Sequence, residues 1–226
     1  ILNMKDYLKK FEKLIDPIGR RDGMVINSPF CHLGTKKRLM MVGHNPGGVS
    51  VRSKTSIKED WNRHTNDPFF NALEEDWDGK KGKHPIQLLN KILIENTTLK
   101  QSDILSTNVY WLRSRNSEQL KVDALLEKKC RDGFLYNLEV HKPDCVLFLG
   151  HVSSDIASRW ACGCLPKGST IFPWGNDQVI KFKKMKFNKN GFMNTLSIPH
   201  PSRFRLGKNS ERISSIIKAL ESNGIY

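Results

Sequence analysis

RLMMVGHNPGG, at residues 38–48, places an apolar run directly before a glycine-rich loop. The run from Arg38 to Val42 has the length and composition of a buried β-strand, and the loop after it holds an amide side chain, Asn45, between glycines. A second apolar run, Met193 to Ile198, precedes the loop PHPSRFR at residues 199–205. Loops that follow parallel strands meet at the carboxyl edge of a sheet, where ligands bind. We therefore expect the two loops to form one polar site beside groups that can bind phosphate.

The order of the apolar patterns predicts an α/β fold. The patterns indicate strands at residues 38–42, 103–109, 144–149, 178–187 and 192–198, and helices at residues 4–14, 69–77, 86–95, 118–140, 153–160 and 210–222. Asn190-Gly191 predicts a hairpin between the last two strands. Strands separated by helices require right-handed crossovers, so we expect a three-layer αβα fold with a central, mainly parallel four-stranded sheet. Residues 1–226 contain no linker and are expected to form a single domain, with the motifs at 38–205.

The charge of the chain favours a polyanionic partner. The sequence has 37 Lys and Arg against 23 Asp and Glu, a net charge of +14 and a pI near 9.6. Residues 167–226 hold 11 Lys and Arg against 3 Asp and Glu, so more than half of the excess lies around the second motif. Lysines alternate with apolar residues at 181–187, which is typical of a half-buried strand with one side toward phosphate. DNA is the expected partner, and the alternative is a basic surface that serves only solubility.

The remaining composition indicates a cytoplasmic, DNA-associated protein without a cofactor. No apolar run approaches the roughly 20 residues that span a bilayer, and no charged-then-apolar leader is present. We therefore expect no membrane contact. The five cysteines have no recognised ligand spacing, so we expect reduced thiols and no metal. The alternative is a metal or redox pair at Cys162-Gly163-Cys164, which lacks a second Cys or His pair at finger spacing. Cys145 lies in an apolar run and is expected in the core; the other cysteines are Cys31, Cys130, Cys162 and Cys164.

Four motifs together resemble those of a known enzyme family. Gly43 to Gly47 and His200 to Ser202 resemble the two signature motifs of the uracil-DNA glycosylase superfamily, particularly its mismatch-specific and single-strand-selective branches, whose first motif is Gly-x-Asn-Pro-Gly. Ile104 to Asn108 resembles the strand whose last Asn reads the edge of the base. Asp67 to Asn71 resembles the segment that supplies a stacking phenylalanine. The resemblance implies a DNA glycosylase of this fold. It implies no iron-sulfur cluster, because the cysteines do not reproduce the spacing of the branch that has one.

Asn45 and His200 are the expected catalytic residues. Hydrolysis of an N-glycosidic bond needs a held water and stabilisation of the negative charge that grows on the departing pyrimidine. Asn45 can orient the water, although a neutral amide is not a strong base. His200 can donate a hydrogen bond to the O2 atom of the base, and the alternative is a histidine satisfied by backbone. Gly43, Gly47 and Gly48 allow close approach of the backbone, or form an ordinary tight turn.

Four further residues are expected to bind the base. Asn108 can offer a donor and an acceptor to a flipped pyrimidine, with a structural cap as the alternative. Phe70, or less favourably Phe69, is expected to stack on the base, although either could be a core residue. His44 is either a donor in the pocket or a surface side chain.

The segment after His200 occupies the place of the loop that enters the duplex in this family. Phe204 or Arg203 is expected to fill the hole left by the flipped nucleotide, and Arg205 and Ser202 to contact phosphate.

One departure from the family bears on the substrate. Members that exclude thymine have a tyrosine directly after the first proline, and this chain has Gly47 there. We therefore expect a monofunctional glycosylase that removes uracil or a 5-modified pyrimidine and leaves an abasic site. Bulky modified cytosines of viral DNA would give it a role in defence. The alternatives are a catalytically inactive DNA-binding module and a nucleoside hydrolase, which the charge disfavours. A monomer is the simplest assumption.

Overall fold

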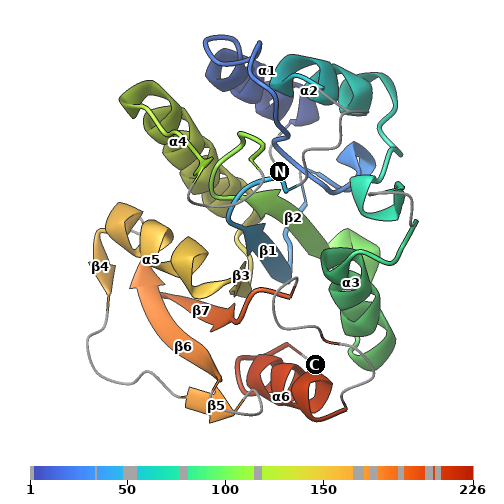
Figure 1. Cartoon of the computed structure of the whole chain (residues 1–226), viewed down its shortest axis with the longest axis vertical. Helices are drawn as coiled ribbons and strands as arrows, with labels where there is room; N and C mark the ends of the chain where they lie inside the picture. Colours follow the sequence, from blue (N-terminus) through green and yellow to red (C-terminus); the bar gives the residue numbers. More distant parts are fainter. Residues whose placement is uncertain are drawn as a thin grey trace.

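The computed structural model describes residues 3–33, 35–47, 55–76, 81–114, 119–164, 171–173, 178–187, 191–201, 206 and 210–225. Four parallel strands form the centre of its sheet (Figure 1). They lie in the order β2 (Ile104–Asn108), β1 (Leu39–Gly43), β3 (Cys145–Leu149) and β7 (Met193–Ile198). β6 (Val179–Lys186) runs antiparallel to β7, and the short strands β4 (Gly163–Cys164) and β5 (Ile171–Pro173) pair antiparallel with β6. The predicted four-stranded parallel centre is confirmed, and the antiparallel strands extend it on one side.

Helices cover both faces of this sheet. Alternate residues of a strand point to opposite faces, so the apolar strands present side chains to a helix layer on each side. Met40, Val42 and Phe148 belong to one core cluster, which also contains residues of α1 (Met4–Ile15), α2 (Ile57–Asn66), α4 (Ala124–His141) and α5 (His151–Trp160). Leu39, Met41 and Leu147 belong to a second cluster with α3 (Pro85–Asn96) and α6 (Ser210–Glu221). Figure 1 shows α6 and α4 on opposite sides of the strands. The three-layer αβα fold is therefore confirmed. Single 3-10 turns occur at Phe30–His32, Ala72–Glu74 and Gln101–Asp103.

The helix expected at residues 69–77 is a wrong prediction over its described part, 69–76. This segment holds only the 3-10 turn Ala72–Glu74. The Asn71 side chain accepts a hydrogen bond from the Leu73 amide (3.1 Å) and donates one to Glu74 (2.8 Å). Asparagine competes in this way with regular helical hydrogen bonding, so the chain forms a local turn instead.

Two other helix boundaries differ from the sequence pattern. The pattern at 118–140 begins as a helix only at Ala124, because Asp123 caps it by accepting from the Leu126 amide at 2.8 Å. α2 was not predicted, since most of its residues are polar. Its start nevertheless has a recognisable signal, the capping box formed by Ser56 and Glu59.

Cys145 is buried in β3, as predicted, and Cys130 is also buried. None of the five cysteines forms a disulfide. In the part of the chain that the structure describes, no three His, Cys, Asp or Glu side chains are grouped to hold a metal ion. None of the described helices is long and apolar enough to cross a membrane.

Candidate active site

The ends of the four parallel strands bring the two motifs to one edge of the sheet. Gly43 at the end of β1 pairs in register with Asn108 at the end of β2. On the other side, β3 lies between β1 and β7, and Leu149 pairs with Ile198. The loops that carry Asn45, Asn108, Gly150 and His200 therefore start from adjacent strands. The expected meeting of the four loops at the carboxyl edge agrees with this register.

Asn108 lies directly over the backbone of Gly43. A Cβ atom added to Gly43 would overlap with Oδ1 of Asn108, so a larger residue at this position of β1 would displace the Asn108 side chain. The Asn108 side chain is only 5% exposed, and it makes no hydrogen bond to another residue that the structure describes. A nearly buried amide with its donor and acceptor unspent is suited to pair with a polar ligand at this edge.

The side chain of Asn45 holds two loops together. Its Nδ2 donates to the carbonyl of Pro46 (3.0 Å), the carbonyl of Leu112 (3.2 Å) and the hydroxyl of Ser114 (2.9 Å). The backbone supports the same connection, since the amide of Ser114 donates to the carbonyl of Pro46 at 3.3 Å. Asn45 thus fixes the loop after β1 against the loop after β2. The residues of this second loop were not predicted as part of the site.

His44 lies between Asn45 and an aromatic residue of the neighbouring loop. Its Nδ1 is 2.9 Å from Oδ1 of Asn45, and its ring meets Tyr110 edge-on with centroids 5.7 Å apart. Tyr110 is held in turn by Glu127 of α4, to which its hydroxyl donates at 2.8 Å; Trp160 of α5 donates to the same carboxylate at 2.9 Å. Burial lowers the pKa of His44, and the hydrogen bond to Asn45 partly opposes this. The half-buried ring is therefore neutral near pH 7 and belongs to an ordered network.

Arg113 supports the far end of the glycine loop. It donates to the carbonyl of Gly47 at 2.7 Å, and its other side meets Asp22 at 3.3 Å. A Cβ atom added to Gly47 would meet no atom of the described residues within 4 Å. Arg113 thus holds the backbone at Gly47 in place, and no described residue fills the space beside its α-carbon.

His200, which follows β7, lies near the end of β3, and His151, which follows β3, lies near the end of β7. Gly150 has a φ of 101°, a conformation that favours glycine, and a Cβ added there would lie 3.5 Å from the His200 ring. His151, the first residue of α5, faces β7 with Nδ1 2.9 Å from the Ser197 hydroxyl. Burial and then Lys181 lower the pKa of His151. Its position was not predicted, although it directly follows the apolar run that forms β3.

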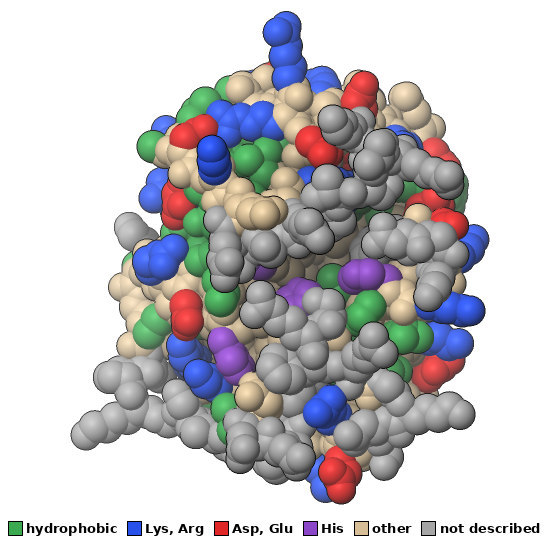
Figure 2. Space-filling model, viewed as in Figure 1, with side chains coloured by type: hydrophobic (Ala, Val, Ile, Leu, Met, Phe, Trp, Pro, Cys, Tyr) green, Lys and Arg blue, Asp and Glu red, His purple; other side chains and the backbone are tan. Residues whose placement is uncertain are grey.

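On the face of the molecule that Figure 2 shows, histidine side chains lie near the middle, and most Lys and Arg side chains lie closer to the edge. The chain matches the Uracil DNA glycosylase superfamily over residues 31–221. The chain belongs to this superfamily. The matched range contains all four motifs and the strands β1 to β7. Membership supports DNA glycosylase activity, a hydrolysis, on uracil-type bases of DNA. No curated protein matches the chain.

The phenylalanines expected to stack on the base in this superfamily differ in environment. Phe69 is 79% exposed, whereas Phe70 is half-buried. Phe70 meets the His64 ring edge-on at 4.8 Å, and the Arg63 guanidinium lies 5.2 Å from its centroid. These ring contacts attach Phe70 to α2 rather than to the four strand-end loops. Its stacking role stays a prediction.

The expected DNA-contacting residues of the superfamily lie beyond the described part of the chain. These are Ser202, Arg203, Phe204 and Arg205, together with Gly48 of the first motif. The described Pro201 is buried and ends the visible part of this loop.

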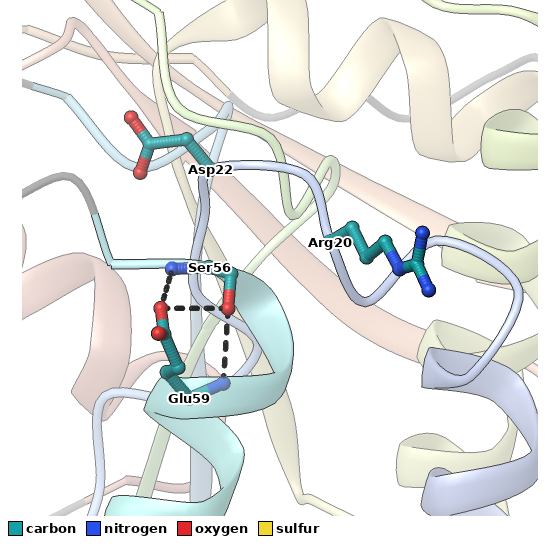
Figure 3. Close-up of a pocket in the computed structure, with 4 residues that line it drawn as sticks. All are labelled: Arg20, Asp22, Ser56 and Glu59. Atoms are coloured by element: carbon teal, nitrogen blue, oxygen red, sulfur yellow. Dashed lines mark hydrogen bonds between the residues drawn. The ribbon is translucent and has the colours of Figure 1, made fainter.

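A pocket elsewhere on the surface has polar walls, formed by Arg20, Asp22, Ser56 and Glu59 (Figure 3). Glu59 turns toward Ser56 and accepts from its amide and its hydroxyl, both at 2.8 Å, so the pair is occupied by capping α2. Asp22 and Arg20 point away from this pair in Figure 3. The pocket lacks side chains that converge on one point, and the chemistry of the family motifs lies at the strand ends instead.

Proposed function

We propose that the protein is a monofunctional DNA glycosylase of the kind whose first motif is Gly-x-Asn-Pro-Gly. It would flip a pyrimidine out of DNA, hydrolyse the N-glycosidic bond and leave an abasic site. The observation that carries the proposal is the register of β1, β2, β3 and β7, which starts the loops of Asn45, Asn108 and His200 from neighbouring strand ends. A lyase reaction would need an amine nucleophile, and neither the 43–48 motif nor the 199–205 motif contains a lysine.

Each of the three residues has a distinct task in this proposal. The unspent amide of Asn108 pairs with the edge of the flipped base, and an unmatched base would leave the amide unpaired in a buried place. His200 donates a hydrogen bond to O2 as negative charge develops on the pyrimidine. Asn45, which ties the first two loops together, fixes the place of the attacking water.

The open space beside Gly47 supports a base with a 5-substituent. Family members with tyrosine at this position use it as a wall against such groups, and glycine leaves the space free. We infer that the pocket accepts 5-modified pyrimidines in addition to uracil. A substrate of this kind, such as a hydroxymethylated or glucosylated cytosine of viral DNA, would place the enzyme in defence rather than repair.

Base release from a panel of labelled DNAs tests the proposal. Single- and double-stranded oligonucleotides would carry uracil, thymine, hydroxymethylcytosine or glucosylated hydroxymethylcytosine, with Asn45→Ala as the control. We expect release of at least one base that depends on Asn45. Release of uracil alone would contradict the inference about the 5-substituent. Tight binding without release from any DNA would contradict the glycosylase and favour a binding module.

A further inference from the structure

The orientation of the Asn45 amide is determined by its neighbours. Two of the groups next to Nδ2 are the carbonyl oxygens of Pro46 and Leu112, at 3.0 and 3.2 Å. A carbonyl oxygen only accepts hydrogen bonds, so the amide nitrogen must be the atom on that side. Rotating the amide by half a turn would place Oδ1 against both carbonyls. The atom that faces His44 is therefore Oδ1, which is an acceptor.

This orientation determines the tautomer of His44. Because Oδ1 only accepts, the ring nitrogen 2.9 Å away, Nδ1, carries the hydrogen. In a neutral imidazole the other nitrogen, Nε2, then has a free lone pair. Within the described part of the chain, no hydrogen bond occupies Nε2. The site thus contains a nitrogen base of fixed orientation one residue before the amide of the motif.

We propose that Nε2 of His44 is the general base that takes a proton from the attacking water, and that Asn45 is the positioning residue that holds His44 in the required tautomer. The inference rests on the proposed glycosylase function. His44 supplies the proton acceptor that the motif otherwise lacks, since the neutral amide of Asn45 can place water but cannot accept its proton. Placed general bases contribute roughly 10²- to 10⁴-fold to a rate.

The step balances with water as the only co-reactant. The water oxygen bonds to C1′ of the deoxyribose while the bond from C1′ to the pyrimidine nitrogen breaks. The electron pair of that bond leaves with the pyrimidine, whose O2 faces the His200 donor. The proton of the water passes to Nε2, and the resulting imidazolium releases it to solvent, from which the pyrimidine anion is protonated. No oxidant or second nucleophile is needed.

The surroundings of His44 keep the base form populated. Burial lowers its pKa, so protonation occurs below the usual 6.5. Ionisable groups of the neighbouring loops and helices have contacts of their own. Tyr110 donates to Glu127, Arg159 of α5 acts on Tyr110, and Arg113 is held by Gly47 and Asp22. The rate should therefore be constant near neutral pH and fall as the pH drops through the pKa of His44.

The test replaces His44 with asparagine. In His44→Asn the new amide nitrogen takes the place of Nδ1 and still donates to Asn45, whereas nothing replaces Nε2. The matched control is His32→Asn, which removes an imidazole whose pKa is also lowered by burial. His32 lies by Lys37 at the amino end of β1, away from the strand ends of the site. Single-turnover release of the base that the wild-type protein cleaves best would be measured from pH 4.5 to 8.5, with thermal unfolding of each variant.

We expect His44→Asn to lose about 10²-fold or more in rate and to lose the fall in rate at acid pH, while His32→Asn keeps both. If the wild-type protein is active and a folded His44→Asn variant keeps its rate and pH profile, the role of His44 is overturned. The glycosylase proposal would then remain intact. A wild-type protein that releases no base would overturn both. For a variant that does not fold, His44→Gln offers the second measurement, and a retained acid limb in that variant would also overturn the proposal.

Discussion

The closest constraint in the site is between two residues, Gly43 and Asn108. An added Cβ at Gly43 would overlap with Oδ1 of Asn108. The Asn108 side chain, rather than the backbone, would have to move. We expect Gly43→Ala to fold but to displace the amide by a fraction of its own length. Displacements of about 1 Å cost roughly 10²-fold in rate, so kcat/KM for base release should fall by about this factor. Gly163→Ala, in the outer strand β4, is the control, because Lys186 at 3.7 Å is the only described residue that its Cβ would meet. Equal kcat/KM values for the two variants would show that Asn108 does not read the base.

Asn45 offers a test of whether its amide nitrogen is used structurally. Asn45→Asp exchanges an NH2 group, whose hydrogens point to three oxygen atoms, for an acceptor that faces the carbonyls of Pro46 and Leu112. We expect this variant to lose about 1–3 kcal/mol of unfolding free energy and to release base more slowly than the wild type. Denaturant unfolding and single-turnover release measure the two effects. Asn62→Asp places the same charge on an exposed position of α2 and should change neither. A faster Asn45→Asp enzyme would mean that residue 45 itself acts on the water.

Gly47 can be used to close the space that the proposal leaves for a 5-substituent. Its backbone needs no positive φ, and no described residue lies within 4 Å of an added Cβ, so we expect a side chain to fit there without backbone strain. We expect Gly47→Tyr to retain release of uracil and to lose release of 5-modified pyrimidines. The ratio of the two kcat/KM values, measured on otherwise identical oligonucleotides, is the readout. An equal fold-decrease of kcat/KM on both substrates would show that the tyrosine disturbs the loop and does not selectively exclude the 5-substituent.

At the scale of the element, α2 carries two ionisable side chains on its buried face. Burial raises the pKa of Asp60 to about 7, and Arg63 and Arg113 only partly oppose this. Between the usual value of 3.8 and 7, the folded state binds more protons than the unfolded state, so the free energy of unfolding falls as pH rises. Asp60→Asn removes this loss. It should therefore stabilise the protein by about 2–3 kcal/mol more at pH 8 than at pH 5.

Urea unfolding of Asp60→Asn at the two pH values measures this difference. The control is Asp76→Asn, which removes an exposed carboxyl group and should change the unfolding free energy equally at both. His64, on the same face, does not alter the comparison, because both proteins contain it. An equal effect of Asp60→Asn at pH 5 and pH 8 would show that the Asp60 carboxyl is already ionised at the lower pH.

The elements that sequence predicts best are those whose apolar pattern and burial agree. β1, β2 and β3 are buried along their whole length, and runs of apolar residues identify β1 and β3. β2 begins with the apolar pair Ile104 and Leu105 and continues with polar residues. α2 escapes this reasoning because its buried face includes Asp60 and His64 as well as Ile57 and Trp61. The motifs likewise predict which strand ends carry the site. They cannot predict that Leu112 and Ser114 bind Asn45, because those hydrogen bonds depend on the register of β1 with β2.

On the scale of the whole molecule, two lysines of β6 lie near the strand ends that carry the site. Lys181 of β6 pairs in register with Ser197 of β7, and Ser197 is in turn next to His151. Lys183 lies two residues further along and meets Asp155 at 3.6 Å. Because β6 runs antiparallel to β7, its first lysines lie beside the carboxyl ends of the parallel strands. DNA held at this edge would meet their charge, and counterions released from it would make binding depend on salt.

Lys181→Gln tests whether this edge holds the phosphate backbone. Each phosphate contact contributes a slope of roughly one to the fall of log affinity with log salt concentration. We expect the variant to bind duplex DNA more weakly at low salt, with a slope smaller by about one, and to keep the single-turnover rate at saturating enzyme. Lys9→Gln removes the same charge from an exposed position of α1 and should leave the slope unchanged. Fluorescence anisotropy at about 50 to 300 mM salt, where phosphate contacts become screened, would measure the affinities. Equal slopes for both variants would place the DNA away from β6 and leave its lysines as a solvated surface.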